Sequence, residues 1–173
     1  MWWLPLIAAA EPSAVDSVRA RWKQVQGIKR AGALYAFEID ANPEDRQWAA
    51  VGNYQDVITC HRFTRGEAPY PQPEPILVEL HQSAAAAEQS RTFLYTDQGE
   101  LVFAHASSTR HPDWRVYWTD EKVLRVQRAD KALSIEEPPA AAAALWASGM
   151  SAFRLCVHAT KAEGVWTELP GAR

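Results

Sequence analysis

The sequence predicts an α+β fold. We expect a curved antiparallel β-sheet, a meander of about six to eight strands, with an N-terminal and a C-terminal helix packed on one face. Two observations indicate this class: a hairpin pattern occurs twice, in residues 93–103 and 116–126, and an amphipathic helical pattern stands near each end of the chain. The length of 173 residues suits one domain with a sizeable core.

The composition is that of an ordinary globular protein, with 47% hydrophobic and 23% charged residues. The net charge is −3, the pI is near 6.0, and no cluster of lysine and arginine offsets the acidic balance. These features argue against nonspecific binding to nucleic acid or to an anionic membrane surface.

The first ten residues, Met1–Ala10, resemble a secretory signal segment. They are apolar and end in small residues, with Ala8 and Ala10 at the cleavage positions, although a positively charged start is missing. We therefore expect a signal segment at 1–10, one domain at 11–163, a flexible tail at 164–173, and a periplasmic or secreted location. The alternative is an apolar N-terminus docked on the core of a cytoplasmic protein. The segment is too short to span a bilayer, so no membrane span is expected.

A first helix is expected from Ser13 to Gln26. Ser13 is a favourable N-cap with Asp16 three residues later, and Gly27 stands where the helix would end. Its apolar stripe, which we expect to pack against a sheet, comprises Val15, Val18, Trp22 and Val25.

The middle of the chain reads as strands separated by turns. The expected elements are a strand at 34–40, a hairpin of 48–51 with 54–63, a proline-rich loop at 66–75, a strand at 76–81, and a loop or single helical turn at 83–90. In the second arm of the hairpin, alternation places Val57, Thr59, His61 and Phe63 on one face.

The two repeated hairpins align at an offset that pairs Tyr95 with Trp118 and Leu101 with Leu124. Gly99 supplies a residue tolerant of positive φ in the first turn, whereas the second turn has a lysine there and is expected to use another geometry. Simple alternation puts Leu101 with Phe103 on one face of the outgoing strand, and Leu124 with Val126 on one face of its counterpart.

A long amphipathic helix is expected from Pro139 to about Lys161. Its apolar positions recur at helical spacing and are Trp146, Met150, Phe153, Val157 and Thr160. Gly149 weakens such a helix by about 1 kcal/mol relative to alanine. The alternative is a break at Gly149 followed by a strand at 152–158.

The order of helix, hairpins and helix, together with residues 93–103 and 116–126, resembles a group of uncharacterised exported bacterial proteins with paired YYFDxGxL hairpins after an N-terminal helix. The hairpin unit is also similar to the short repeats of MORN-type proteins. The resemblance implies architecture and export only, because no activity is established for the group.

The chain has two cysteines, Cys60 and Cys156. A disulfide between them would close a long loop and would suit an exported chain, whereas the alternative that the sequence favours is two buried free thiols. Their spacing fits no metal motif, and no metal or cofactor is expected.

No motif for catalysis stands out. His61, His81 and His105 lie on expected strands, and a hydrolase site would need them to converge with nearby carboxylates. Asp97 and Asp120 occupy equivalent turn positions, where aspartate usually bonds its own backbone. Ser107, Ser108 and His111 are close in sequence without the surroundings of a catalytic triad.

The remaining candidate is an aromatic set on the two hairpins, which consists of Tyr95, Phe103, Tyr117 and Trp118. If part of the set faces solvent, it offers a binding surface for a protein or an envelope component; if the helices cover it, it is core. The leading hypothesis is a non-enzymatic exported binding module. The alternatives are a small hydrolase with a histidine and carboxylate site, or a cytoplasmic immunity or inhibitor protein.

Overall fold

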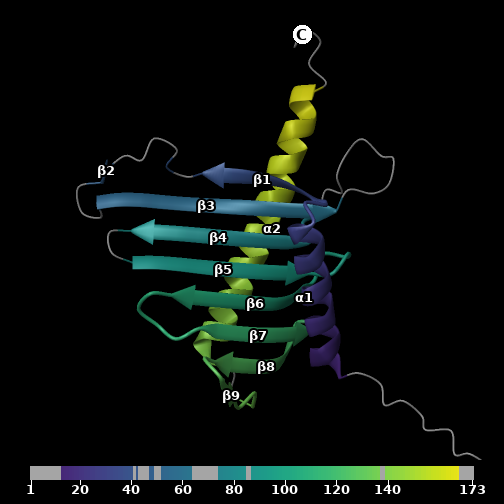
Figure 1. The fold of residues 1–173 in the computed structure, drawn as a ribbon, viewed down its shortest axis with the longest axis vertical. Coiled ribbons are helices and arrows are strands. Elements are labelled where there is room, and N and C mark those ends of the chain that lie inside the picture. Colours follow the sequence, from purple (N-terminus) through teal and green to yellow (C-terminus); the bar gives the residue numbers. More distant parts are fainter. Residues whose placement is uncertain are drawn as a thin grey trace, which may run out of the picture.

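The computed structural model describes residues 13–40, 42, 47–48, 52–63, 74–84, 87–136 and 139–167. Within these residues the chain forms two helices and nine antiparallel strands (Figure 1). The elements are α1 Ala14–Arg30, β1 Leu34–Asp40, β2 Gln47–Trp48, β3 Gly52–Phe63, β4 Leu77–Ala84, β5 Ala87–Tyr95, β6 Leu101–Ser108, β7 Trp114–Thr119, β8 Lys122–Arg128, β9 Lys131–Leu133 and α2 Ala140–Thr167.

The sheet is a meander, in which strands that follow one another in the chain lie side by side. The order is β1-β3-β4-β5-β6-β7-β8-β9, and the two-residue strand β2 pairs with the start of β3. Every pairing is antiparallel. The predicted α+β class, with an antiparallel meander and a helix near each end, is confirmed.

The two helices lie on opposite faces of the sheet, so the expectation that both pack on one face is wrong. In Figure 1, α1 passes in front of the strands at one end of them, and α2 passes behind them. The physical reason is that the central strands are apolar on both sides: Leu77 and Leu94 pack under α1, whereas their neighbours Val78 and Phe93 pack under α2. A sheet with two apolar faces needs a cover on each.

The helix α1 begins as predicted and ends later. Ser13 caps it by accepting a hydrogen bond from the Asp16 backbone N–H at 3.2 Å. The helix continues through Gly27 to Arg30, and the chain turns at Gly32 with a φ of 69°. Gly27 remains helical, with open space around it, and does not end the helix. The helix ends instead where Gly32 adopts a positive φ.

The helix α2 is continuous, without the alternative break at Gly149, and it runs beyond the predicted end near Lys161. At Gly149 an added Cβ would lie 2.8 Å from Leu101 Cδ2 and 2.9 Å from Phe93 Cδ1, so glycine permits the helix to approach the sheet closely. The hydroxyl of Tyr95 donates to the Gly149 carbonyl at 2.7 Å. By length and composition alone, Ala140–Thr160 also qualifies as a membrane span, a test that core helices pass too.

A disulfide joins Cys60 on β3 to Cys156 on α2, so the interpretation of two free thiols is wrong. Both cysteines are fully buried. Beside them lies Arg62, also fully buried, whose Nη2 donates to the Cys156 carbonyl at 2.8 Å and whose guanidinium stands 4.5 Å from the centre of the Phe37 ring. The sheet and α2 are therefore joined by covalent, polar and apolar contacts in one place.

Each of the two repeated hairpins carries a β-bulge in its outgoing strand. The extra residue is Val102 in β6 and Leu124 in β8. Because two residues at a bulge oppose one on the partner strand, both turn to the same side. The α1 side of the sheet therefore receives Val102 with Phe103, and Leu124 with Arg125.

The bulges overturn the predicted alternation. Leu101 does not share a face with Phe103, and Leu124 does not share one with Val126. The predicted alignment of Leu101 with Leu124 is also wrong, because Val123 takes the place of Leu101 under α2. The cause is a turn that is one residue shorter in the second hairpin.

The two turns differ in geometry, as predicted from the missing glycine. Gly99 in the first turn has a φ of 84°. In the second turn two non-glycine residues, Asp120 and Glu121, have φ values of 46° and 63°. Positive φ at both central positions is the feature of a two-residue hairpin turn whose twist matches the strands.

The alanine-rich segment 83–90, predicted as a loop or helical turn, is largely strand. β4 continues to Ala84 and β5 begins at Ala87, with Ala84 paired to Ala87. Pairing along the sheet overrides the helical preference of alanine here. The signal segment at 1–10, most of the proline-rich loop, and residues 168–173 of the predicted tail lie outside the described residues.

Replacing Gly149 with alanine tests the close approach of α2 to the sheet. We expect the free energy of unfolding to fall by about 1–3 kcal/mol, because the added methyl group overpacks Phe93 and Leu101. The matched control is Gly27→Ala in α1, where the space around the glycine is open. This substitution should raise the free energy of unfolding by about 0.5–1 kcal/mol. Chemical denaturation measures both, and equal stabilisation of the two variants would contradict the close approach.

Candidate functional site

The four aromatic residues singled out in the sequence are all buried. Tyr95 is 0% exposed, Trp118 2%, Tyr117 5% and Phe103 6%. Tyr95 and Trp118 pack under α2, and Phe103 and Tyr117 pack under α1. These four residues are therefore part of the core, as the alternative interpretation predicted, and they form no open aromatic surface. A binding role for Phe103 and Tyr117 stays a prediction, because both line a cavity.

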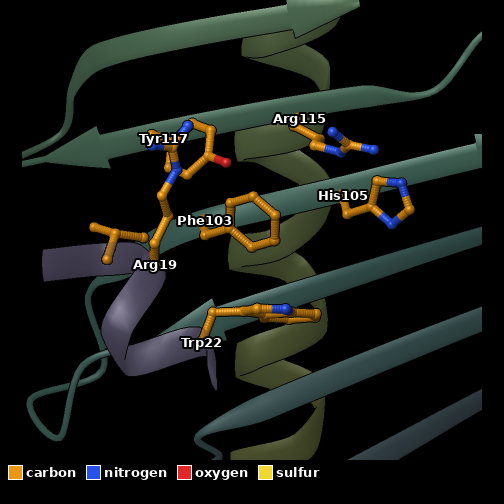
Figure 2. Close-up of a pocket in the computed structure, with 7 residues that line it drawn as sticks. Arg19, Trp22, Phe103, His105, Arg115 and Tyr117 are labelled. Carbon is orange, nitrogen blue, oxygen red and sulfur yellow. The ribbon is translucent and has the colours of Figure 1, made fainter. Parts of the chain in front are cut away.

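That cavity, called here the α1 pocket, lies between α1 and strands β6 and β7 and has a volume of about 360 Å³. Figure 2 shows the side chains that line it, which come from the helix and from the two strands. Its lining consists of Val18, Arg19 and Trp22 from the helix, Phe103 and His105 from β6, and Arg115 and Tyr117 from β7.

Three aromatic rings form an apolar wall of the α1 pocket. The centroids of Trp22 and Phe103 are 5.1 Å apart, and those of Phe103 and Tyr117 are 5.0 Å apart. Both pairs are tilted, with interplanar angles of 59° and 51°, which is a favourable geometry for aromatic contacts. The rings therefore support one another and present a preorganised apolar surface to the cavity.

Two arginines stand at different sides of this wall. The guanidinium of Arg19 lies 5.8 Å from the Tyr117 ring centre and forms an ion pair with Asp16 at 3.2 Å. Arg115 lies beside His105, since the two are paired across β6 and β7, and Figure 2 shows their side chains adjacent. Among the described residues no acidic group forms an ion pair with Arg115.

A third arginine, Arg125, reaches the same side of the sheet because of the bulge in β8. It pairs with Tyr117 across the strands, and its Nε is buried with no hydrogen-bond partner among the described residues. The pKa of Asp16 lies below its usual value, chiefly because Ser13 donates a hydrogen bond to it, with Arg19 and Arg125 contributing less. The surroundings of the α1 pocket are therefore cationic.

The three strand histidines do not converge. His61 bonds Glu79 through Nε2 at 2.8 Å, and His105 bonds Asp113 through Nε2 at 3.3 Å. Their strands, β3 and β6, are three spacings apart in the sheet, or roughly 14 Å. His81 lines a different, shallow cavity. No group of three or more potential metal-binding side chains occurs among the described residues.

The other sequence candidates have structural roles. Asp97 does not accept a hydrogen bond from its own backbone; it accepts one from Arg21 Nη2 at 2.7 Å. In this turn, the backbone N–H groups of Gln98 and Glu100 donate instead to Thr96 Oγ1. Ser107 bonds Ser90 side chain to side chain at 2.6 Å, in the cavity that His81 lines. These residues assemble no triad with His111, which is exposed in a loop.

Comparison with family models, curated proteins and solved structures finds no match to this chain. The site is therefore assigned from its geometry. The sequence patterns do not single out Arg19, Arg115 or Arg125 as site residues, and they predict only a core role for Trp22. One signal was available: alternation puts Arg115 and Tyr117 on the same face of one strand.

The polar cluster under the end of α1 predicts a pH dependence of stability. Glu79 accepts a hydrogen bond from His61 and pairs with Lys29 of the helix. The His61 hydrogen bond is the largest cause that lowers the pKa of Glu79 from 4.5 to about 2, with the Lys29 pair adding to it and burial opposing. The resulting stabilisation is present above pH 4.5 and is lost as the pH falls towards 2.

We expect Glu79→Gln to lower the free energy of unfolding at pH 7 by about 1–2 kcal/mol, a value reduced because the side chain is partly exposed. The loss should shrink below pH 4.5. Glu88→Gln, at an exposed position of β5, is the control. Urea denaturation at several pH values measures both. A loss that is the same at pH 7 and pH 2 would contradict the assignment.

Proposed function

We propose that this protein is an exported, non-enzymatic binding module and that its ligand occupies the α1 pocket. The observation that carries the proposal is the α1 pocket itself, where an arginine without an ion-pair partner among the described residues stands beside a preorganised aromatic wall. A concave apolar site with a few fixed polar groups is the usual form of a small-molecule site.

Export is supported by the disulfide between Cys60 and Cys156. Disulfides form and persist in oxidising compartments and are rare in the cytosol. The apolar segment Met1–Ala10 and the resemblance to exported proteins with paired hairpins point the same way. The alternative of a cytoplasmic immunity or inhibitor protein needs that segment to belong to the fold, and it lies outside the described residues.

A binding role is favoured over the hydrolase alternative by the chemistry of the lining. The described residues that line the α1 pocket include no serine, threonine or cysteine to act as a nucleophile. His105 and Asp113 form a pair beside the pocket, but His61 and His81 lie elsewhere. The arrangement offers positively charged and apolar groups for recognition.

Intact-mass analysis tests export. When the protein is expressed with its native N-terminus in a bacterium that has a periplasm, we expect a periplasmic product cleaved after Ala10. Its mass should lack two hydrogens because of the disulfide. A cytoplasmic product that retains Met1 and carries two free thiols would contradict export and favour the cytoplasmic alternative.

Protein-detected NMR with a fragment library of neutral, anionic and cationic compounds tests the site. We expect the largest amide shifts of the hits to cluster on residues of the α1 pocket. His105→Trp should abolish these responses, because the indole occupies space at a half-buried position of the lining. The matched control is His111→Trp at an exposed loop position, which should leave them unchanged.

Two results would contradict the proposed site: hits that scatter over the surface, or hits at the α1 pocket that persist in a folded His105→Trp protein. Circular dichroism and thermal unfolding establish that each variant is folded.

A further inference from the structure

We infer that the ligand of the α1 pocket is a small aromatic carboxylate whose flat body lies on the aromatic wall and whose carboxylate is held by Arg115. The inference rests on the proposed function and names the ligand class for that site. The volume of about 360 Å³ is near the lower end of the range for ligand sites, roughly 300–1,000 Å³, which suits a small molecule.

The apolar end of the site selects a flat, apolar body. Trp22, Phe103 and Tyr117 follow one another at centroid spacings of 5.1 and 5.0 Å, and Val18 adds an aliphatic contact from the helix. Figure 2 shows the three rings grouped on one side of Arg115 and His105. An aromatic ligand gains both area burial and ring contacts there.

The other end selects a carboxylate. Arg115 is held on a central strand, and its side chain has no hydrogen bond or ion pair with a described residue. A guanidinium presents a planar set of donors that matches a carboxylate with two parallel hydrogen bonds. A ligand carboxylate would supply the partner that the described residues do not.

The charges that face the α1 pocket favour an anion. Among the described residues, Arg19 and Arg115 line it, Arg125 is paired with Tyr117 on the same side of the sheet, and two carboxylates, those of Asp16 and Asp113, bond lining residues. Asp16 is bound by Arg19, and Asp113 is hydrogen-bonded to His105. The balance near the site is positive although the whole chain carries a net charge of −3, which favours an anionic ligand at this place.

Isothermal titration calorimetry with three matched probes tests this ligand class. The probes share one ring system and differ in charge: 2-naphthoate, 2-naphthylmethanol and 2-naphthylmethylamine. We expect 2-naphthoate to bind most tightly and the amine to bind most weakly. In Arg115→Gln the affinity for 2-naphthoate should fall at least about tenfold, whereas the affinity for the alcohol should change less than about threefold.

Two further variants separate charge from geometry. Arg128→Gln is the matched control, because Arg128 is on the neighbouring strand β8 but stacks on Trp114 on the α2 side of the sheet, and it should leave binding unchanged. Arg115→Lys keeps the charge without the planar set of donors, and it should recover only part of the lost affinity.

The outcomes distinguish this inference from the proposed function. If the alcohol or the amine binds as tightly as 2-naphthoate and His105→Trp blocks it, the α1 pocket is a binding site but the carboxylate class is wrong. The same holds if none of the three binds while other fragments shift the pocket residues. If no fragment of any charge perturbs the α1 pocket, both proposals fall.

Discussion

The close packing of α2 against the sheet is the contact on which the rest of the structure depends. Gly149 lets the helix backbone approach Phe93 and Leu101, and the approach brings its carbonyl within reach of the buried Tyr95 hydroxyl. That hydroxyl is fully desolvated, and burial raises the pKa of Tyr95 well above its usual value. Since a buried donor without a partner costs about 1–3 kcal/mol, the hydrogen bond and the close packing require each other. The disulfide at Cys156 then joins the same helix to β3.

The helix α2 covers one face of the sheet, and the shorter helix α1 packs on the other face, where polar side-chain contacts help to hold it. Arg21 bonds the Tyr95 carbonyl and Asp97 at the first hairpin turn, and Lys29 pairs with Glu79 on β4. Figure 1 shows α1 over only one end of the strands. Beside the helix, Phe103 and Tyr117 meet polar and cationic side chains, and the α1 pocket forms at this boundary. The site thus lies where, among the described residues, α1 covers only one end of the strands on this side of the sheet.

Much of the fold could be predicted from the sequence, because hydrophobic periodicity and turn chemistry act locally. The Ser13 cap, the strand Leu34–Asp40 and the repeated hairpins are of this kind. The bulges could not be predicted, since they depend on pairing across strands, and they alone decide that Arg125 faces α1. The site also could not be predicted, because Trp22, Phe103 and Arg115 are far apart in the sequence and meet only in the folded protein. Each of them has an ordinary structural explanation when it is considered alone.

The proposed carboxylate-binding site has its aromatic wall on the face of the sheet that α1 covers. A crystal structure of the protein in complex with 2-naphthoate would show where the ligand binds and how its carboxylate is held. We expect the naphthyl ring to lie against Trp22 and Phe103, and both carboxylate oxygens to lie within hydrogen-bond distance of the Arg115 guanidinium. Ligand density at another place on the protein, or a naphthyl ring in the α1 pocket with its carboxylate turned away from Arg115, would contradict it.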